Sequence, residues 1–336
     1  MSAGSSPVGQ TPEPLSIVRF IPVWSFEAIF VPALILLLGI GMAFVEPRFL
    51  SSRNVTNILV QCSYLAVAAS AQTIVMIGRG IDLSIGGAIS LVSVTTALIA
   101  TSQALSPIDP ALGVVIAIAG GLLTASLVGA LNGAAVAALR INPVITTLGT
   151  FYVCTGIAAS LSDGRPVFNV PADFSYLLYD ASIFGVKAPI VVAIVIGLLA
   201  HLFLNSTVSG RSLYIIGSNP RAGYVAGLPI RWRLALAYVI SAAIAGCCAI
   251  MLTARTGSGE PSIGATLMLP SIAAAVIGGV SMRGGSGSII QAFMGALLTT
   301  LISNSMNLLR VSGYMQDILM GVFVVLAVLV YSRKRR

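Results

Sequence analysis

Long apolar runs constrain this chain more than any other feature of its sequence. The sequence is 57% hydrophobic and 8% charged, whereas soluble domains carry roughly 25% charged residues. A helix needs about 20 apolar residues to cross a bilayer. The strands of a transmembrane barrel alternate apolar and polar residues instead, so continuous runs exclude that fold. We therefore expect an all-α polytopic membrane protein.

The runs predict ten membrane-spanning helices between two polar tails. Residues 1–25 are rich in Ser, Pro and Gly and are expected to be disordered. The first run begins too late and is too long for a cleaved signal peptide. Residues 26–331 are expected to form one transmembrane domain, and residues 332–336 a basic tail. The ten helices are predicted near residues 27–45, 56–78, 84–101, 112–139, 144–162, 188–204, 233–253, 266–281, 288–308 and 314–331.

The distribution of basic residues predicts the orientation of these helices. With the N-terminus inside, twelve of the eighteen Lys and Arg residues fall on the cytoplasmic side and six on the other side. Loops that face the cytoplasm carry such an excess of positive charge. Both termini and the loop at residues 206–232 are therefore expected to be cytoplasmic. The net charge of +8 follows from this topology and gives no reason to expect a nucleic-acid partner.

The loop at residues 206–232 carries the signals of a short helix. Asn219 suits an N-cap and Pro220 the first helical position, while Gly227 suits a left-handed stop. By i, i+3, i+4 spacing, three apolar residues then share one face: Ala222, Val225 and Ala226. Between Asn205 and Arg233 the chain has no acidic residue and four arginines: Arg211, Arg221, Arg231 and Arg233. A small apolar face outside the bilayer predicts a docking surface for another protein.

Two pairs of matching segments predict an inverted repeat. An acid shortly before Ser-Ile-Gly opens both the third and the eighth predicted helix, and a Leu-Arg pair follows both the fourth and the ninth, at Arg140 and Arg310. Each pair lies five helices apart, and an odd offset places the two copies in opposite orientations across the membrane. Helices two to five and seven to ten are thus expected to be related. The matching residues are Asp82, Ser84 and Gly86 in one copy, and Glu260, Ser262 and Gly264 in the other.

The sequence lacks the machinery of an enzyme or of a self-powered transporter. A P-loop needs a lysine after a glycine-rich loop, and neither Lys187 nor Lys334 has that setting. Ion-driven carriers usually bury acids or histidines, whereas His201 is predicted near the inner end of the sixth helix. We find no catalytic or metal-binding pattern, and we expect the cysteines to be small buried hydrophobes: Cys62, Cys154, Cys247 and Cys248. Energy is therefore expected to arrive from a separate protein through the loop at 206–232.

Uncharged polar residues are the candidates for a transport path. Thr300, Asn304 and Asn307 share one face of the ninth predicted helix by i, i+4, i+7 spacing. Asn142 and Thr146 lie at the start of the fifth. Amides and hydroxyls suit a neutral polyol or sugar. The alternative is hydrogen bonding between helices, which membrane proteins often use.

Several segments together resemble the sugar ABC transporter permeases of the ribose, xylose and autoinducer-2 type. Residues 80–86 (GIDLSIG) are similar to that family's GIDLSVG signature, and residues 139–150 (LRINPVITTLGT) and 278–287 (GGVSMRGGSG) are similar to two further blocks. The segment from Gly210 to Ala222 is similar to a fourth block. The resemblance covers about residues 50–331 and favours sugar permeases over the more distant branched-chain amino-acid permeases. Gly223 departs from the family's usual Ala, which puts the rigidity of the short helix in doubt.

The resemblance implies a permease subunit of an ATP-driven importer in a bacterial inner membrane. Its implied partners are a second permease chain, identical or a sister, a periplasmic binding protein that delivers a sugar or related small polar solute, and a subunit that uses ATP and Mg. The permease itself would bind no cofactor. Docking of the ATP-binding subunit is implied for these residues: Arg211, Gly217, Asn219, Pro220, Arg221, Ala222, Tyr224, Val225 and Gly227.

The residues leave some alternatives open. An ion-coupled secondary carrier also uses inverted repeats, and a membrane scaffold or receptor would not transport at all. The carboxylates of Asp82 and Glu260 either cap the helices that follow them or belong to a gate, and Asp82 has an ATPase-linked role as a further alternative.

Overall fold

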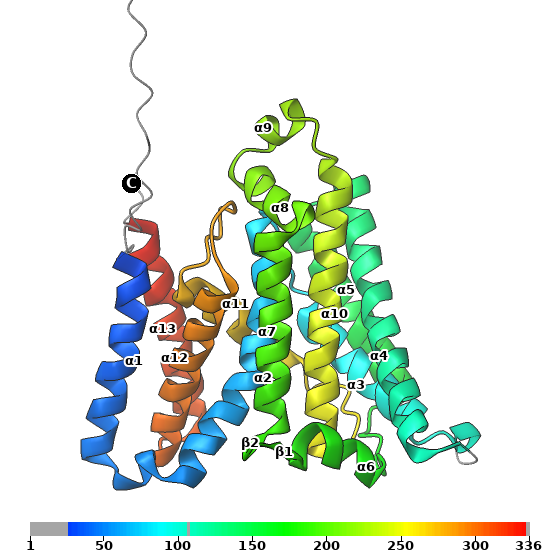
Figure 1. The fold of residues 1–336 in the computed structure, drawn as a ribbon, viewed down its shortest axis with the longest axis vertical. Helices are drawn as coiled ribbons and strands as arrows, with labels where there is room; N and C mark the ends of the chain where they lie inside the picture. The colour runs from blue at the N-terminus through cyan, green and yellow to red at the C-terminus, as the bar shows by residue number, and fades with distance from the viewer. Residues whose placement is uncertain (1–25, 106–107, 334–336) are drawn as a thin grey trace, which may run out of the picture.

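The structure, a computed structural model, describes residues 26–105 and 108–333. These residues form thirteen α-helices and one two-stranded antiparallel hairpin. Most of the helices run side by side along the long axis of the molecule (Figure 1). The tail at 1–25 and the last three residues of the basic tail lie outside the described residues.

A helix lies over each of the ten predicted segments. Six helices are long and apolar enough to cross a membrane, namely α2, α5, α7, α10, α12, and α4 together with the π turn that continues it. The chain is therefore a polytopic membrane protein, as predicted. The ten helices are α1 (Phe26–Val45), α2 (Ser52–Ile77), α3 (Ile85–Ala100), α4 (Pro110–Gly133), α5 (Pro143–Leu161), α7 (Ala188–Ser206), α10 (Ile230–Thr256), α11 (Ala265–Gly278), α12 (Ile289–Leu308) and α13 (Gly313–Arg333).

Local chemistry sets most of the helix ends. The Asp109 carboxylate accepts hydrogen bonds from the first amides of α4, and the Asn142 side chain does the same for α5. Gly257 and Gly279 adopt left-handed conformations, with φ of 64° and 113°, directly after α10 and α11. Because Gly279 ends α11, this helix is shorter than the segment predicted at 266–281.

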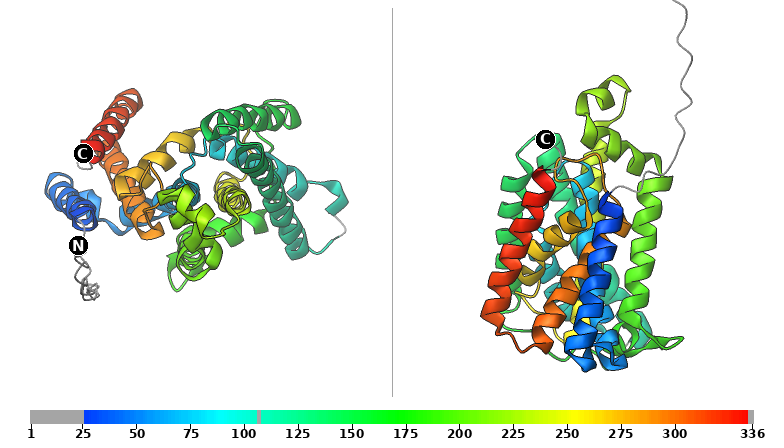
Figure 2. Two further views of the ribbon diagram at one scale, coloured as in Figure 1. Left: turned by 90° about the horizontal axis from the view of Figure 1, so that it is seen from above. Right: turned by 90° about the vertical axis from the view of Figure 1, so that its left-hand side faces the viewer.

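The helices form a bundle around α2. Within its apolar window 83% of α2 is buried, compared with 17% for α5. Helices α1 and α13 lie at one edge of the bundle, and α4 and α5 form the opposite edge (Figure 2). Helix α5 therefore presents most of its apolar side chains to the outside of the molecule.

Helices α3 and α11 meet where each begins. A Cβ added to Gly264 would overlap the carbonyl oxygen of Gly86, and one added to Gly86 would lie 2.8 Å from the Gly264 carbonyl oxygen. The Gly264 amide donates to Ser90 Oγ at 3.0 Å. The two Ser-Ile-Gly segments of the sequence thus come together as a contact of backbone on backbone.

The segments α2–α5 and α10–α13 have left-handed residues at matching positions. Arg79 and Gly257 follow α2 and α10, and both have positive φ, at 70° and 64°. Arg140 and Arg310 precede α5 and α13, and both have φ of 58°. Residues other than Gly seldom adopt this conformation, so its recurrence at matching positions is informative.

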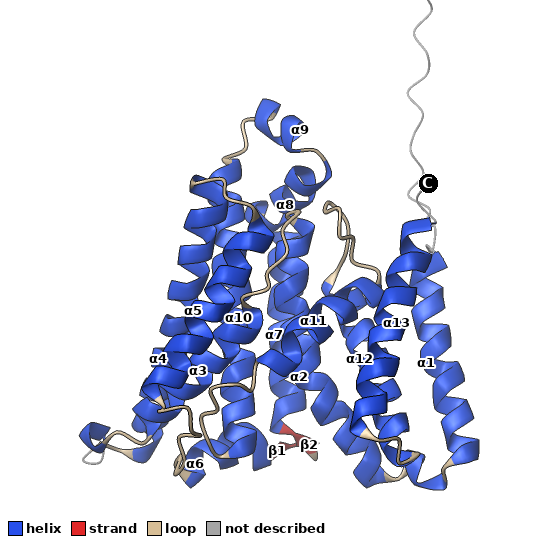
Figure 3. Ribbon diagram, turned by 180° about the vertical axis from the view of Figure 1, so that it is seen from behind, coloured by secondary structure: helices blue, strands red, loops and turns tan. Residues whose placement is uncertain are grey.

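Two short helices and a hairpin were not foreseen from the sequence. Helix α8 (Val208–Ser218), which is one of them, and the predicted helix α9 (Pro220–Val225) form one end of the molecule, which we call the α9 end. A short helix α6 (Ala172–Ser175) and the hairpin of β1 (Ser182–Ile183) and β2 (Val186–Lys187) lie at the opposite end (Figure 3). The hairpin makes the fold slightly less than all-α.

Candidate functional site

Helix α9 has the ends that the sequence predicts. Asn219 Oδ1 accepts hydrogen bonds from the amides of Arg221 and Ala222, at 3.0 and 3.2 Å. Gly227 is left-handed, with φ of 71°. The helix signals in the loop at 206–232 are thereby confirmed.

The outward face of α9 is uncovered in the isolated chain. The Val225 side chain is 82% exposed and Tyr224 is 78% exposed. Arg221, Ala222 and Ala226 are exposed as well. Neighbouring exposed apolar side chains of this kind mark surfaces that contact other molecules.

Gly223, the residue that put the rigidity of the short helix in doubt, is buried on the inner side of α9. A Cβ added there would lie 3.4 Å from Ile216 Cγ1, which is ordinary van der Waals contact. The site has room for the alanine that the resembling family carries. This glycine is therefore not required by a close approach of the backbone.

Helix α8, which the sequence did not predict, carries α9 on the rest of the molecule. Thr207 Oγ1 caps it by accepting from the amide of Gly210 at 2.9 Å. Arg211 donates to the carbonyl of Ser206 at 3.4 Å, and Arg233, at the start of α10, donates to Ser209. One residue, Asn219, separates α8 from α9.

The far end of α8 packs against two other segments without intervening side chains. The amide of Gly285 donates to the carbonyl of Ile77, the last residue of α2, at 2.9 Å. A Cβ added to Gly217 would overlap that carbonyl oxygen and would lie 2.5 Å from the Gly285 amide nitrogen. We call the contact of Gly217, Ile77 and Gly285 the glycine junction.

A tyrosine reinforces the glycine junction. Tyr214, one turn earlier on α8, donates its hydroxyl to the carbonyl of Gly287 at 3.0 Å. Burial raises the pKa of the Tyr214 phenol, which keeps the group protonated and able to donate. Helix α8 is thus tied to the turn between α11 and α12 by a side chain as well as by backbone contact.

The segment at 80–86 is held by a chain of hydrogen bonds. Thr150 Oγ1 donates to Asn132 Oδ1 at 2.6 Å, Asn132 Nδ2 donates to Ser84 Oγ at 2.7 Å, and Ser84 Oγ donates to Asp82 Oδ1 at 2.5 Å. With its amide oxygen and nitrogen exchanged, the Gln72 side chain accepts from the backbone N–H of Asp82 at 3.2 Å and donates to the backbone C=O of Asp82 at 3.0 Å. These contacts fix the loop between α2, α4 and α5.

Helix capping does not explain the two acids. Asp82 Oδ1 accepts from the backbone amide of Ser84, which precedes α3, and the Glu260 carboxylate accepts from Ser258 Oγ at 3.3 Å. Neither α3 nor α11 has a side-chain hydrogen bond at its N-cap. The acids stabilise the turns before the helices, so the capping interpretation was wrong. Ser262 is exposed beside Glu260 and has no such network.

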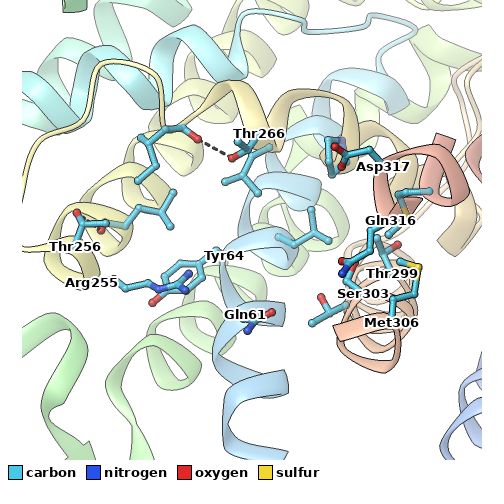
Figure 4. Close-up of a pocket in the computed structure, with 17 residues that line it drawn as sticks. Gln61, Tyr64, Arg255, Thr256, Thr266, Thr299, Ser303, Met306, Gln316 and Asp317 are labelled. Carbon is cyan, nitrogen blue, oxygen red and sulfur yellow. Dashed lines mark hydrogen bonds between the residues drawn. The ribbon is translucent and has the colours of Figure 1, made fainter. Parts of the chain in front are cut away.

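A cavity of about 580 Å³ lies in the half of the molecule opposite the α9 end (Figure 4). We call it the five-helix cavity because α2, α10, α11, α12 and α13 line it. The Arg255 guanidinium lies over the Tyr64 ring, 5.4 Å from its centroid. Polar side chains also line the cavity: Gln61, Thr256, Thr266, Thr299, Thr300, Ser303, Gln316 and Asp317.

The predicted path residues do not come together. Thr300 lines the five-helix cavity. Asn304 instead forms two reciprocal amide hydrogen bonds with Asn54 of α2, at 2.9 and 3.1 Å. Asn307 accepts from Gln316 at 2.9 Å. Asn304 therefore fits the alternative that the sequence left open, which is bonding between helices.

Asn142 and Thr146 lie elsewhere. Asn142 is exposed as the N-cap of α5. Thr146 lines a separate, mainly apolar pocket between α4 and α5. These two residues share no cavity with Thr300.

The face of α12 that was predicted to line the path is displaced by about one residue from the face that lines the cavity. Thr299, Ser303 and Met306 share this face by i, i+4, i+7 spacing. The predicted face of Thr300, Asn304 and Asn307 is rotated from it by about 100°. A polar spacing that includes Thr299 and Ser303 was available in the sequence, but nothing in it identified the neighbours of each face.

The described part of the chain contains no group of three or more His, Cys, Asp or Glu residues placed to hold a metal ion. Its four cysteines are free thiols, three buried and one half-buried.

Comparisons with known proteins identify the family. The family model described as branched-chain amino acid transport system / permease component matches residues 54–328. This chain is a member of the ABC transporter permease family. It is a transport component and not an enzyme.

Three of its relatives in Escherichia coli are each 32% identical to it. The D-allose transport system permease protein covers 83% of this chain, with 83% of its own length matched. The ribose import permease protein covers 94% of this chain and is itself 97% matched. The L-arabinose transport system permease protein covers 96% and is 95% matched. The similarity therefore extends over most of this chain and over most of each relative.

Proposed function

We propose that this permease passes a sugar, or a related small polar solute, from a periplasmic binding protein to the cytoplasm across a bacterial inner membrane. The relatives named for allose, ribose and arabinose support a solute of monosaccharide class. The five-helix cavity supports the same class. Hydroxyl and amide groups line it together with the ring of Tyr64, and its volume of about 580 Å³ is in the usual range for small-molecule sites.

The topology is proposed to be ten spans with both termini and the α9 end in the cytoplasm. The excess of basic residues on that side supports it. Helices α2–α5 and α10–α13 form the inverted repeat. The matched left-handed residues support this relation, Arg79 with Gly257 and Arg140 with Arg310.

The exposed face of α9 is the proposed docking site for an ATP-binding subunit, which uses ATP and Mg. The single observation that carries this is the 82% exposure of Val225 beside Tyr224 on a helix capped by Asn219. A second permease chain, identical or a sister, completes the membrane unit. The proposed docking residues are Arg211, Asn219, Pro220, Arg221, Ala222, Tyr224, Val225 and Gly227. Gly217, which the family resemblance also implied, is buried in the glycine junction and is not part of the exposed face.

Coupling is proposed to run from α9 to the five-helix cavity through backbone contacts. Closure of the ATP-binding subunits pushes α9 and, across Asn219, α8. The glycine junction passes this movement to the end of α2 and to the turn before α12.

The segment at 80–86 acts as the gate in this proposal. It follows the end of α2 and delivers movement to Gly86, which touches Gly264. Helix α11 begins beside Gly264 and lines the five-helix cavity with Thr266 and Leu267. The hydrogen-bond chain from Thr150 to Asp82 keeps the gate rigid, so that it moves as a unit.

The function is tested by reconstituting the permease in proteoliposomes with its ATP-binding subunit and binding protein. Radiolabelled ribose, allose and arabinose are offered one at a time, with ATP in the compartment that faces the ATP-binding subunit. Uptake of one of them is expected only when ATP and both partners are present. Uptake by the permease alone, driven by an ion gradient, would overturn the proposal.

A further inference from the structure

A second cavity lies at the α9 end, between the last turn of α4 and the first turn of α10. Its volume is about 620 Å³. It is separate from the glycine junction and from the five-helix cavity. We call it the α4–α10 pocket, and it is lined by Val136, Ala137, Arg140, Tyr224, Leu228, Pro229, Ile230, Arg231, Trp232 and Leu234.

The α4–α10 pocket is positively charged and has no internal counter-ion. Arg140 and Arg231 both line it and both are exposed, and no acid lines it. Among the described residues the one ion pair joins Arg48 to Glu46, at the opposite end. Two guanidinium groups therefore face one pocket without a carboxylate partner.

The pocket also has an apolar wall beside the wall that carries the two arginines. Val136 on the helical run of α4 and Leu234 on α10 supply an apolar wall on the helix side. Trp232 also lines the pocket and is 66% exposed. Tryptophan is enriched at the boundary between the bilayer and water.

The surface beside the pocket has the character of a bilayer contact. Leu139, directly before Arg140, is 71% exposed. An acyl chain lying against Val136 and Leu139 would place its headgroup at the level of Arg140. The geometry thus matches a lipid, with a polar head at the rim and a chain along α4.

We propose that the α4–α10 pocket binds the headgroup of an anionic phospholipid in the leaflet at the α9 end. Arg140 and Arg231 would hold the phosphate, because a guanidinium matches phosphate oxygens in pairs. Basic pockets between helices at a membrane surface favour anionic headgroups. The inference rests on the proposed membrane orientation for the identity of the leaflet. The alternative occupant is an acidic surface of the ATP-binding subunit, and the apolar wall of Val136 and Leu234 favours the lipid over it.

The test measures lipid retained by the purified complex of the permease with its ATP-binding subunit, using native mass spectrometry. Phosphatidylglycerol and phosphatidylcholine with the same acyl chains are added at equal concentration. The wild-type complex is expected to retain phosphatidylglycerol preferentially. The Arg140→Gln/Arg231→Gln variant is expected to lose this preference by about fivefold for each arginine, or about 25-fold in all.

Two further variants control for charge and for folding. Arg53→Gln/Arg165→Gln removes the same net charge at the opposite end and should retain the wild-type preference. Arg140→Lys/Arg231→Lys keeps the charge and should retain most of it. Inorganic phosphate, added in tenfold excess, should not displace the lipid, because it lacks the acyl chains that lie along α4.

Three results would overturn the proposal. They are equal retention of the two lipids by the wild-type complex, equal retention by the wild type and the glutamine variant, and complete displacement by inorganic phosphate. Since lipid retention is measured without transport, its failure leaves the importer function untouched. Failure of uptake would likewise leave the lipid site standing.

Discussion

The α9 end and the five-helix cavity lie at opposite ends of the same helices and are built differently. At the α9 end the decisive contacts are made by backbone, as at Gly217 and Gly285, where a methyl group does not fit. The five-helix cavity is lined by side chains of five helices, such as Tyr64, Arg255 and Ser303. A region that transmits force needs rigid contacts, whereas a region that meets a solute can change its lining without moving its backbone.

The first prediction breaks the docking contact at the α9 end and has the largest expected effect. Val225→Asp places a charge in the surface proposed to be covered, and an unpaired charge in a buried contact costs several kcal/mol. Co-purification of the ATP-binding subunit, measured by affinity pull-down, should weaken on the order of 100-fold, and sugar uptake should fall with it. Val186→Asp is the matched control, because Val186 is an exposed valine at the opposite end. Normal co-purification of Val225→Asp would refute α9 as the docking helix.

The second prediction separates docking from transmission. Gly217→Ala forces a methyl group into the glycine junction, and such overpacking costs about 1–3 kcal/mol. The ATP-binding subunit should still co-purify, whereas uptake per ATP hydrolysed should fall about tenfold.

Gly223→Ala is the control for this prediction, because it adds the same methyl group where there is room. Its uptake should match the wild type, and α9 should gain up to about 1 kcal/mol of helix stability. Equal coupling in both variants would show that the glycine junction transmits nothing.

The third prediction tests the five-helix cavity. Ser303→Leu fills the cavity with an apolar side chain and should reduce uptake about fivefold, through a raised KM for the loaded binding protein and solute. Asn307→Leu, on the neighbouring face of α12, should change uptake less than about twofold. Initial uptake rates normalised to the amount of protein in the membrane measure both. A larger effect of Asn307→Leu would restore the path predicted from the sequence.

The fourth prediction concerns stability and not transport. Asn304→Leu leaves the buried amide of Asn54 without its partner, which costs about 1–3 kcal/mol. The loss should appear as a lower midpoint of thermal unfolding in detergent. Asn54→Leu/Asn304→Leu removes both amides and should recover most of that midpoint. If the double variant is stable but fails to transport, the amides have a role in the path.

The helices of the α9 end show how far sequence reasoning reached. Helix α9 was predictable because its signals are local, with Asn219, Pro220 and Gly227 within nine residues. Helix α8 was missed, although Thr207 is an ordinary N-cap for it. Its amphipathic face is short and has meaning only against α2 and α10, which the sequence does not place beside it.

The two acids and the path residues show where sequence reasoning stopped. Asp82 and Glu260 were recognised as a matching pair, but chain order alone left helix capping open as one of their roles. Their actual partners include Ser84, and through it Asn132 of α4. Such a chain of hydrogen bonds depends on which helices are neighbours.

The sequence by itself determined that this protein lies in a membrane, how its helices are ordered, and that α9 stands apart from them. These properties depend on hydrophobicity, spacing and capping, which act over a few residues. Only the tertiary structure decided that Ser303 and not Asn304 lines the five-helix cavity. It also decided that Gly86 meets Gly264 and that Gly217 meets Ile77. The physical reason is that such contacts join residues far apart in the chain, so helix packing selects them and local composition does not.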